Sequence, residues 1–326
     1  MSHRLRQLKR RVRRPLEWLG IFAAQLVFAH VSHRVLLLIC DAISGVGYYL
    51  DRYGRELSRR NLRIVFHGRE IPRRREELIL RRSYRNMMRT MGHIFWTSRK
   101  AAERARSVGE LSPACHEMLA RYRPAVTVSA HLGCWEVLSQ LVYLEGREII
   151  SVAKDIGSAG MTELLMKGRR SLGQKIVPAE GAFRPLYEGM RNGADVGLLV
   201  DQVVKPKNGG VWVWYFDRPV PVSVAPAFLS AKTHAPVLMA WCRPLKDGRY
   251  RCELIAEFPW EKGMDVWGRT QAVMSALERT IRRHPSCWVL NYRYFRKFPT
   301  VEELKQLQKR TAERKAKEDR HGHDEV

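Results

Sequence analysis

The segment VTVSAHLGCWE, residues 126–136, holds the change of pattern that decides the fold. It begins with a run rich in β-branched residues, passes through small residues to His131, and continues through a turn at Gly133 into the start of a helix. Strand, turn and helix in this order form the unit from which parallel sheets are built. Because ligands of such sheets bind beyond the carboxyl ends of the strands, His131 stands where chemistry is expected.

The chain on either side of this segment continues the same alternation. Short β-like runs occur at residues 125–130, 148–153, 195–200, 236–241 and 250–255. Helical patterns separate most of them, for example at 161–172 and 225–233. This rhythm predicts an α/β core over residues 124–300, with a mostly parallel central sheet flanked by helices. A basic helical region, 51–123, is expected to pack on that core, and a charged helical tail follows at 301–326.

The first 50 residues combine positive charge with apolar stretches. A basic run from Arg4 to Arg14 precedes two apolar stretches, 18–33 and 35–50. Four interpretations compete: a cleaved signal peptide, a single spanning helix, an interfacial or re-entrant helix pair, and an amphipathic core helix pair. No small-x-small cleavage site follows, and both flanks are basic, which suits helices that stay on one side of a membrane. We therefore expect a helical, membrane-attaching N-terminal region.

Charge and cysteine content limit the function classes. Lys and Arg total 58 against 33 Asp and Glu, a formal net charge of +25. Such a surface attracts nucleic acid, anionic membrane or acidic partners. No zinc-finger spacing, RNA-recognition aromatic pattern or bZIP heptad occurs, so nucleic acid is not expected as a partner. The six cysteines form no C-x-x-C pair, which argues against a zinc ribbon or disulfide framework and favours reduced thiols.

His131 and Glu136 are candidates for acid–base chemistry. Residues five apart do not share a helix face, but they can meet if His131 lies in the turn and Glu136 in the first turn of the helix. Glu136 could then accept a hydrogen bond from one imidazole nitrogen and leave the other as a general base. The plainer interpretation has His131 capping the helix and Glu136 on its surface. Neither the zinc motif H-E-x-x-H nor the serine-hydrolase motif G-x-S-x-G is present.

Several motifs, in order along the chain, resemble one family. The run AHLGCWE, residues 130–136, is similar to the H-x-x-x-x-E motif of the bacterial lipid A biosynthesis acyltransferases (lauroyl/myristoyl type), in the lysophospholipid acyltransferase superfamily. The other similar segments are Asn61-Leu62, Gly168-Arg169-Arg170, LLVDQ at 198–202, Gly209-Gly210, the helix and Ala-Pro-Val at 226–237, His284-Pro285, Trp288 and RYFR at 293–296. The chain departs from the family at Leu290-Asn291-Tyr292 and in the longer turn after Gln202. These departures bear on the acceptor more than on the reaction.

The resemblance implies a glycerolipid acyltransferase-like fold and an O-acyltransferase. It would move a fatty acyl chain from a thioester to a hydroxyl of a membrane lipid, most simply a lipid A precursor in lipopolysaccharide biosynthesis. His131 would be the base, and Glu136 would orient it. The expected substrate-binding residues are Arg169, Arg170, Asp201, Gln202 and Lys154; the arginines would hold phosphate of the acceptor or of the donor's phosphopantetheine arm.

Partners and location follow from the same resemblance. The expected donor is acyl-acyl carrier protein, with acyl-coenzyme A as the alternative, and no metal or organic cofactor is expected. The acceptor would lie in an anionic bilayer, which places the enzyme at the bacterial inner membrane with its catalytic domain on the cytoplasmic face. Two alternatives stay open: an acyltransferase for another glycolipid or lysophospholipid, and a non-catalytic basic membrane-binding protein.

Overall fold

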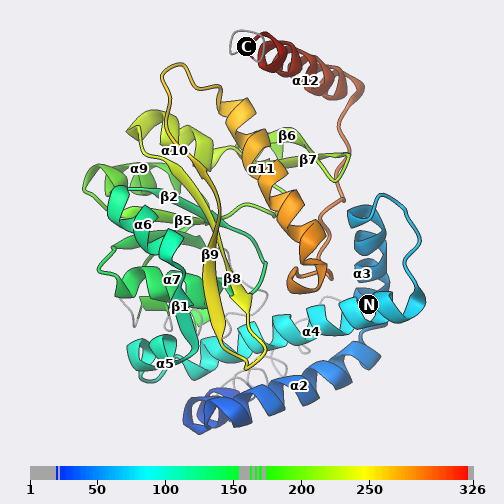
Figure 1. Cartoon of the computed structure of the whole chain (residues 1–326), viewed down its shortest axis with the longest axis vertical. Coiled ribbons are helices and arrows are strands. Elements are labelled where there is room, and N and C mark those ends of the chain that lie inside the picture. The colour runs from blue at the N-terminus through cyan, green and yellow to red at the C-terminus, as the bar shows by residue number, and fades with distance from the viewer. Residues whose placement is uncertain are drawn as a thin grey trace, which may run out of the picture.

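A computed structural model describes residues 20, 23–153, 162–163, 166, 169–170 and 174–321 (Figure 1). The basic run 4–14, Lys154 and residues 322–326 of the predicted tail lie outside the described residues. Strands alternate with helices along the core, as predicted.

A seven-stranded sheet runs through the described part of the core. Its strands, in spatial order, are β1 (Gly109–Leu111), β9 (Tyr250–Phe258), β8 (Val237–Pro244), β2 (Val126–Ser129), β5 (Asp195–Leu199), β3 (Ile149–Ala153) and β4 (Lys175–Pro178). Neighbouring strands are parallel except β8 and β9, which are antiparallel. The mostly parallel sheet is therefore confirmed, and each predicted strand is present. Sequence patterns did not predict the short strands β1 and β4.

Helices cover both faces of this sheet. The helices α9 (Phe183–Arg191), α10 (Ala225–Thr233) and α11 (Val266–Arg283) contact one face; α6 (Pro113–Arg121) and α7 (Trp135–Leu144) contact the other, with α5 (Ala101–Val108) packed on α7. Side chains along β8 alternate between the two faces of the sheet. Met239 and Trp241 belong to the hydrophobic cluster under α9, α10 and α11, and Ala240 and Cys242 belong to the cluster under α7. Because both of its faces are covered, β8 is apolar and buried from Val237 to Cys242.

A two-stranded hairpin lies outside the main sheet. It consists of β6 (Gly210–Tyr215) and β7 (Arg218–Ser223), preceded by the 3₁₀ turn η1 (Pro206–Asn208). A second 3₁₀ turn, η2 (Pro285–Cys287), follows α11. The C-terminal helix α12 (Val301–His321) packs on the hairpin, where Trp214 Nε1 donates to Thr311 Oγ1 at 3.0 Å and Leu307 is buried.

The N-terminal helices form a layer against one end of the core (Figure 1). They are a helical stretch at residues 23–30, α2 (His33–Leu50), α3 (Arg52–Val65) and α4 (Arg73–Trp96). Leu36 and Cys40 of α2 are buried against Phe95 and Trp96 of α4. In the described part of the chain no helix is both long and apolar enough to cross a bilayer.

The outer face of α2 is apolar and exposed. Its large exposed side chains are Val35, Leu38, Ile43, Val46, Tyr49 and Leu50. The second predicted apolar stretch is thus one helix with a buried side and an exposed side, and its cap is Ser32, whose side chain accepts from the backbone of Val35. A contiguous exposed apolar face of this kind marks a surface that something else covers.

Candidate functional site

Sheet register brings His131 and Asp201 together. Strands β2 and β5 are parallel neighbours, and Ser129 pairs with Leu199. Two residues further along each strand stand His131 and Asp201, at the carboxyl edge of the sheet. Because parallel strands end at the same edge, two side chains that follow their strands by the same number of residues meet there.

The carboxylate of Asp201 holds His131 by two hydrogen bonds. His131 Nδ1 lies 2.9 Å from Asp201 Oδ1, and the His131 backbone N–H donates to Oδ2 at 3.1 Å. An ionised carboxylate can only accept, so the neutral imidazole carries its hydrogen on Nδ1 and keeps a lone pair on Nε2. The arrangement fixes both the tautomer and the position of the ring.

Asp201 is completely enclosed by donors. Trp288 Nε1 donates to Oδ2 at 3.0 Å, and the Tyr294 hydroxyl lies 3.5 Å from the same oxygen. Burial raises the pKa of the Asp201 carboxyl, but His131 and the hydrogen bonds from His131 and Trp288 outweigh burial, so the net pKa is lowered. The side chain is therefore a buried carboxylate with its charge shared among several donors.

The other nitrogen of the imidazole faces a less crowded side. Gln202 Nε2 lies 3.3 Å from His131 Nε2, and the His131 side chain is 21% exposed. The Trp135 ring meets the imidazole edge to face, with the ring centroids 4.8 Å apart. His131 is thus clamped on one nitrogen and accessible at the other.

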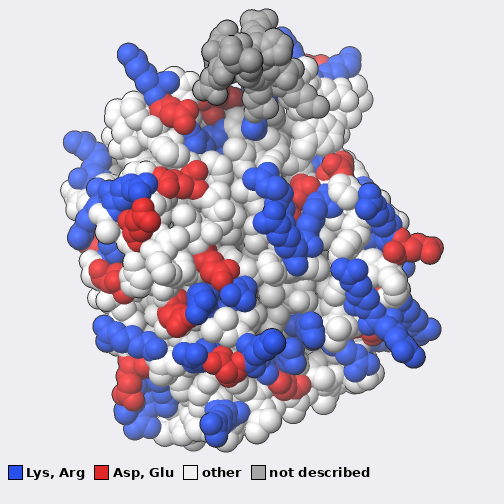
Figure 2. All heavy atoms as spheres, in the orientation of Figure 1, with Lys and Arg blue, Asp and Glu red and all other residues white. Residues whose placement is uncertain are grey.

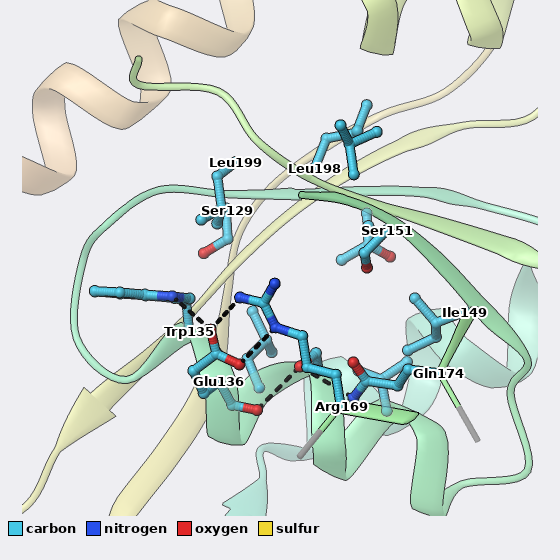
Figure 3. Close-up of a pocket in the computed structure, with 15 residues that line it drawn as sticks. Ser129, Trp135, Glu136, Ile149, Ser151, Arg169, Gln174, Leu198 and Leu199 are labelled. Carbon is cyan, nitrogen blue, oxygen red and sulfur yellow. Dashed lines mark hydrogen bonds and ion pairs between the residues drawn. The ribbon is translucent and has the colours of Figure 1, made fainter. Parts of the chain in front are cut away.

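The expected hydrogen bond between Glu136 and His131 is not formed; Glu136 pairs with Arg169 instead (Figure 3). Arg169 Nε donates to Glu136 Oε2 at 3.0 Å, and Arg169 Nη2 donates to Oε1. Trp135 Nε1 also donates to Oε1, at 3.0 Å. The reason is local geometry: α7 begins at Trp135, so the helix turns the side chain of its second residue inward, away from the loop that carries His131.

In the Glu136–Arg169 pair the carboxylate is buried and the guanidinium is partly buried. Glu136 is 3% exposed, and its carboxylate raises the pKa of the Arg169 guanidinium above its usual value, against the opposing effect of burial. The two pairs, His131–Asp201 and Glu136–Arg169, are joined through Trp135, which contacts one ring and one carboxylate.

A cavity of about 80 Å³ lies beside this second pair. Its polar lining includes Glu136, Arg169 and Gln174, and its apolar lining includes Val142, Ile149, Val152, Leu198 and Leu199. Two hydroxyls on its wall, Thr127 Oγ1 and Ser129 Oγ, have no hydrogen-bond partner among the described residues. Figure 3 shows the guanidinium of Arg169 between Ser129 and Ser151. The cavity thus combines an apolar wall with a cation and unpartnered hydroxyls.

The loop between β2 and α7 is fixed by a glycine. Gly133 has φ +65°, and its N–H donates to Cys287 O at 2.9 Å. A Cβ at this position would stand 2.0 Å from Cys242 O, so only glycine fits. On either side, Val289 N–H donates to His131 O and Cys134 N–H to Cys242 O. Segments distant in the sequence therefore hold His131 in place.

The remaining predicted residues fall in different places. Arg170 follows Arg169 but is exposed, and Lys154 lies outside the described residues. Asn61 is buried and donates from Nδ2 to Leu290 O and Tyr292 O, both at 2.7 Å. Among the described residues, no group of three or more His, Cys, Asp or Glu side chains could hold a metal ion.

Three aromatic residues support the site without having been assigned a role from the sequence. Trp288 and Tyr294 stack on each other, with centroids 4.1 Å apart, and both face Asp201. Trp135 links the two pairs. Trp288 and Tyr294 belong to segments that resemble the family near residues 288–296, and Trp135 lies inside the H-x-x-x-x-E motif. The sequence showed these positions, but no pattern in it predicted which residues they contact.

Comparison with known proteins gives independent information. A family model described as bacterial lipid A biosynthesis acyltransferase matches residues 5–297. Two phosphatidylinositol mannoside acyltransferases of Mycobacterium tuberculosis, from strains CDC 1551 / Oshkosh and ATCC 25618 / H37Rv, are 28% and 27% identical to this chain over 169 residues. Each match covers 50% of this chain and 52% of the relative, so the chain spans about half the length of the curated relatives it matches.

Proposed function

Because this chain belongs to the bacterial lipid A biosynthesis acyltransferase family, we propose that it transfers a fatty acyl chain from a thioester to a hydroxyl of a membrane lipid. The observation that carries the proposal is the His131–Asp201 pair, which fixes the imidazole through Nδ1 and leaves Nε2 on its less crowded side, beside Gln202. A base held in this way resembles the His–Asp part of a hydrolytic triad, with the acceptor hydroxyl in place of the serine.

The reaction then runs in two proton transfers. His131 Nε2 displaces its contact with Gln202 and takes the proton of the acceptor hydroxyl while that oxygen attacks the thioester carbonyl carbon. The negative charge of Asp201 stabilises the imidazolium that forms. When the C–S bond breaks, the proton passes from Nε2 to the departing thiolate, so the enzyme returns to its starting state and no cofactor is consumed.

Glu136 takes a different part from the one its spacing suggested. It holds Arg169 beside the cavity on two of the three guanidinium nitrogens, and we assign to this cation the stabilisation of charge that develops on the thioester carbonyl oxygen. The apolar wall of the cavity suits the first methylene groups of the acyl chain. Arg170, exposed beside it, remains suited to a phosphate of the donor arm or the acceptor.

The donor and the location are proposed from charge. A net charge of +25 favours a small acidic carrier protein as donor, because complementary charge speeds docking; acyl-coenzyme A also carries phosphates. The exposed apolar face of α2 favours contact with a bilayer, which agrees with an acceptor in the bacterial inner membrane and a catalytic domain on its cytoplasmic face.

Two acceptors deserve comparison. A lipid A precursor is the acceptor implied by the family, whereas a phosphatidylinositol mannoside is the one implied by the name of the relatives that match half of the chain. Purified protein is incubated with acyl carrier protein or coenzyme A thioesters and each lipid, and the products are read by mass spectrometry. The lipid that gains one acyl group identifies the acceptor.

The catalytic assignment is tested by His131→Ala. We expect a loss of about 10²–10⁴ in kcat with an unchanged fold, because a general base contributes about that factor. His116→Ala is the matched control, since that histidine lies on α6 with its side chain 53% exposed. Full turnover by His131→Ala would overturn the assignment, and absence of transfer by the unaltered enzyme to any lipid would favour the non-catalytic alternative.

A further inference from the structure

A second and larger hollow lies away from the site described above. It has a volume of about 980 Å³ and is lined by α3, by the turn between β6 and β7, and by residues 293 and 295–298. We call it the α3 groove. None of His131, Glu136, Arg169, Asp201 and Gln202 lines it. Its inner wall includes Phe216, whose ring lies 5.7 Å from that of Trp288, so the groove lies behind the residues that support Asp201.

The groove gathers positive charge without matching acids. Six cationic side chains line it: Arg60, Arg63, Arg218, Arg293, Arg296 and Lys297. In the described part of the chain none of the six forms an ion pair with a carboxylate, whereas many other arginines do. The acidic residue in the lining, Asp217, contacts His67 and Arg282 instead. Mutual repulsion of unpaired cations is relieved when an anion from outside enters between them.

Aromatic side chains stand among these cations. Arg293 Nε donates to the Tyr53 hydroxyl at 2.6 Å, and its guanidinium lies over the same ring. Tyr53 is 61% exposed and Phe298 is 82% exposed. Exposed rings beside cations suit the boundary between water and lipid, where the ring enters the apolar layer and the cation meets a phosphate.

The groove begins close to the end of α2, because Tyr53, which lines it, stands three residues after Leu50. One residue separates the end of α2 at Leu50 from the start of α3, and Tyr49 and Leu50 are exposed at this junction next to Tyr53. Figure 1 places α3 at the end of the layer that α2 and α4 form, and Figure 2 shows Lys and Arg crowded on the surface over that corner of the molecule. The exposed apolar end of α2 and the basic lining of the groove are therefore only a few residues apart along the chain.

We propose that the α3 groove binds the phosphate groups of anionic phospholipids while the α2 face, Tyr53 and Phe298 enter the bilayer surface. A lipid surface fits better than an acidic protein, because it covers the exposed apolar side chains and neutralises the adjoining cations in one contact. The inference rests on the proposed function only in that its acceptor is membrane-borne. The groove would fix how the enzyme sits on the bilayer and would take no part in acyl transfer.

The test measures binding separately from catalysis. The full-length chain carrying His131→Ala is partitioned onto vesicles of phosphatidylcholine with about one-third phosphatidylglycerol, and onto pure phosphatidylcholine vesicles. Arg60→Gln/Arg63→Gln/Arg296→Gln is compared with Arg123→Gln/Arg191→Gln/Lys262→Gln, which removes the same charge from exposed positions outside the groove. Using an inactive background keeps this result independent of whether the proposed chemistry holds.

We expect the groove variant to lose about a hundredfold in partition onto the anionic vesicles, because each of its three cations near an anionic surface contributes about fivefold. The control variant should lose less than about fivefold in total. Phe298→Ser should weaken partition onto both kinds of vesicle. Equal losses in the groove and control variants would overturn the proposal, because only net charge would then matter. So would a groove variant that binds vesicles normally but loses affinity for acidic acyl carrier protein. Melting temperatures confirm that each variant is folded.

Discussion

Asp201 is the residue on which the orientation of His131 depends, because it accepts from both the ring and the backbone of that histidine. Asp201→Asn would keep the shape but place an amide N–H₂ against donors such as Trp288 Nε1. We expect kcat to fall by about 10²–10⁴, since the base loses both its tautomer and the charge that stabilises its protonated form. Steady-state kinetics measure the change.

The matched control is Asp247→Asn, an aspartate with its side chain 51% exposed. Circular dichroism and melting temperature show whether the Asp201 variant has kept its fold. A folded Asp201→Asn enzyme with the original kcat would mean that another group orients His131.

His93 makes stability depend on pH. It is buried, its Nδ1 lies 2.6 Å from Arg89 O, and its Nε2 lies 3.1 Å from His33 Nε2. Burial lowers the pKa of His93 from 6.5 to about 3, so the folded protein binds fewer protons here than the unfolded chain. Stability from this group is complete above pH 6.5 and is lost as the pH falls toward 3, at up to about 1.4 kcal/mol per pH unit.

Urea unfolding at a series of pH values between 7 and about 4 tests this expectation. Burial also lowers the pKa of the neighbouring His33, which adds to the slope in the same direction. His93→Gln should be less stable at pH 7 but show a shallower decline toward acid. A free energy of unfolding that stays constant across this range, or an unchanged slope in His93→Gln, would contradict the assignment.

The pairing of individual side chains is the part that sequence alone did not resolve. His131, Glu136, Arg169 and Asp201 were all predicted as site residues, but His131 was expected to pair with Glu136. The spacing of five residues measures distance along the chain, whereas the pairing depends on β2 and β5 being neighbours, although β3, β4 and several helices separate them in sequence. Had that strand order been known, the positions of His131 and Asp201 after their strands would have predicted the contact.

At the scale of elements, the loop between β2 and α7 determines where the His131 side chain lies. Gly133→Ala would put a Cβ 2.0 Å from Cys242 O at a φ of +65°, so the loop or β8 must move. We expect a loss of about 3 kcal/mol or more in the free energy of unfolding, together with reduced activity because His131 shifts. Urea denaturation and kinetics measure both effects.

Gly146→Ala is a control for backbone conformation alone. Gly146 follows the other end of α7 with φ +75°, but a Cβ there meets no atom within 4 Å. This variant should lose about 1 kcal/mol and keep its activity. Similar losses in the two variants would show that the close approach to Cys242 does not matter.

Strands were predictable from the sequence where a run of apolar residues marks them, and less so where they form through pairing with a distant strand. Apolar runs ending in small or polar residues predicted β2, β3, β5, β8 and β9. The pattern is clearest in β8, whose first six residues are buried. The short strands β1 and β4 carry mostly half-exposed residues, so their pattern is weak. The antiparallel pairing of β8 with β9 follows from the tight turn at Asp247 and Gly248, a signal that the general α/β rhythm concealed.

For the whole molecule, the excess of positive charge gives a prediction about donor choice. A net charge of +25 creates a field that attracts an acidic carrier protein over distances beyond contact. We expect kcat/KM with acyl carrier protein to fall by more than about tenfold when the salt concentration rises from about 0.01 to about 0.5 M, because the Debye length shrinks severalfold.

An uncharged acyl pantetheine thioester, with the acceptor in non-ionic detergent micelles, is the control for this experiment. Its kcat/KM should change by less than about twofold, because a neutral donor is not steered and a non-ionic micelle removes the contribution of anionic lipid. If both donors respond to salt alike, the effect lies in the catalytic steps. If neither donor responds to salt, the positive charge does not guide the carrier protein. The excess of Lys and Arg would then act only in contact with the membrane.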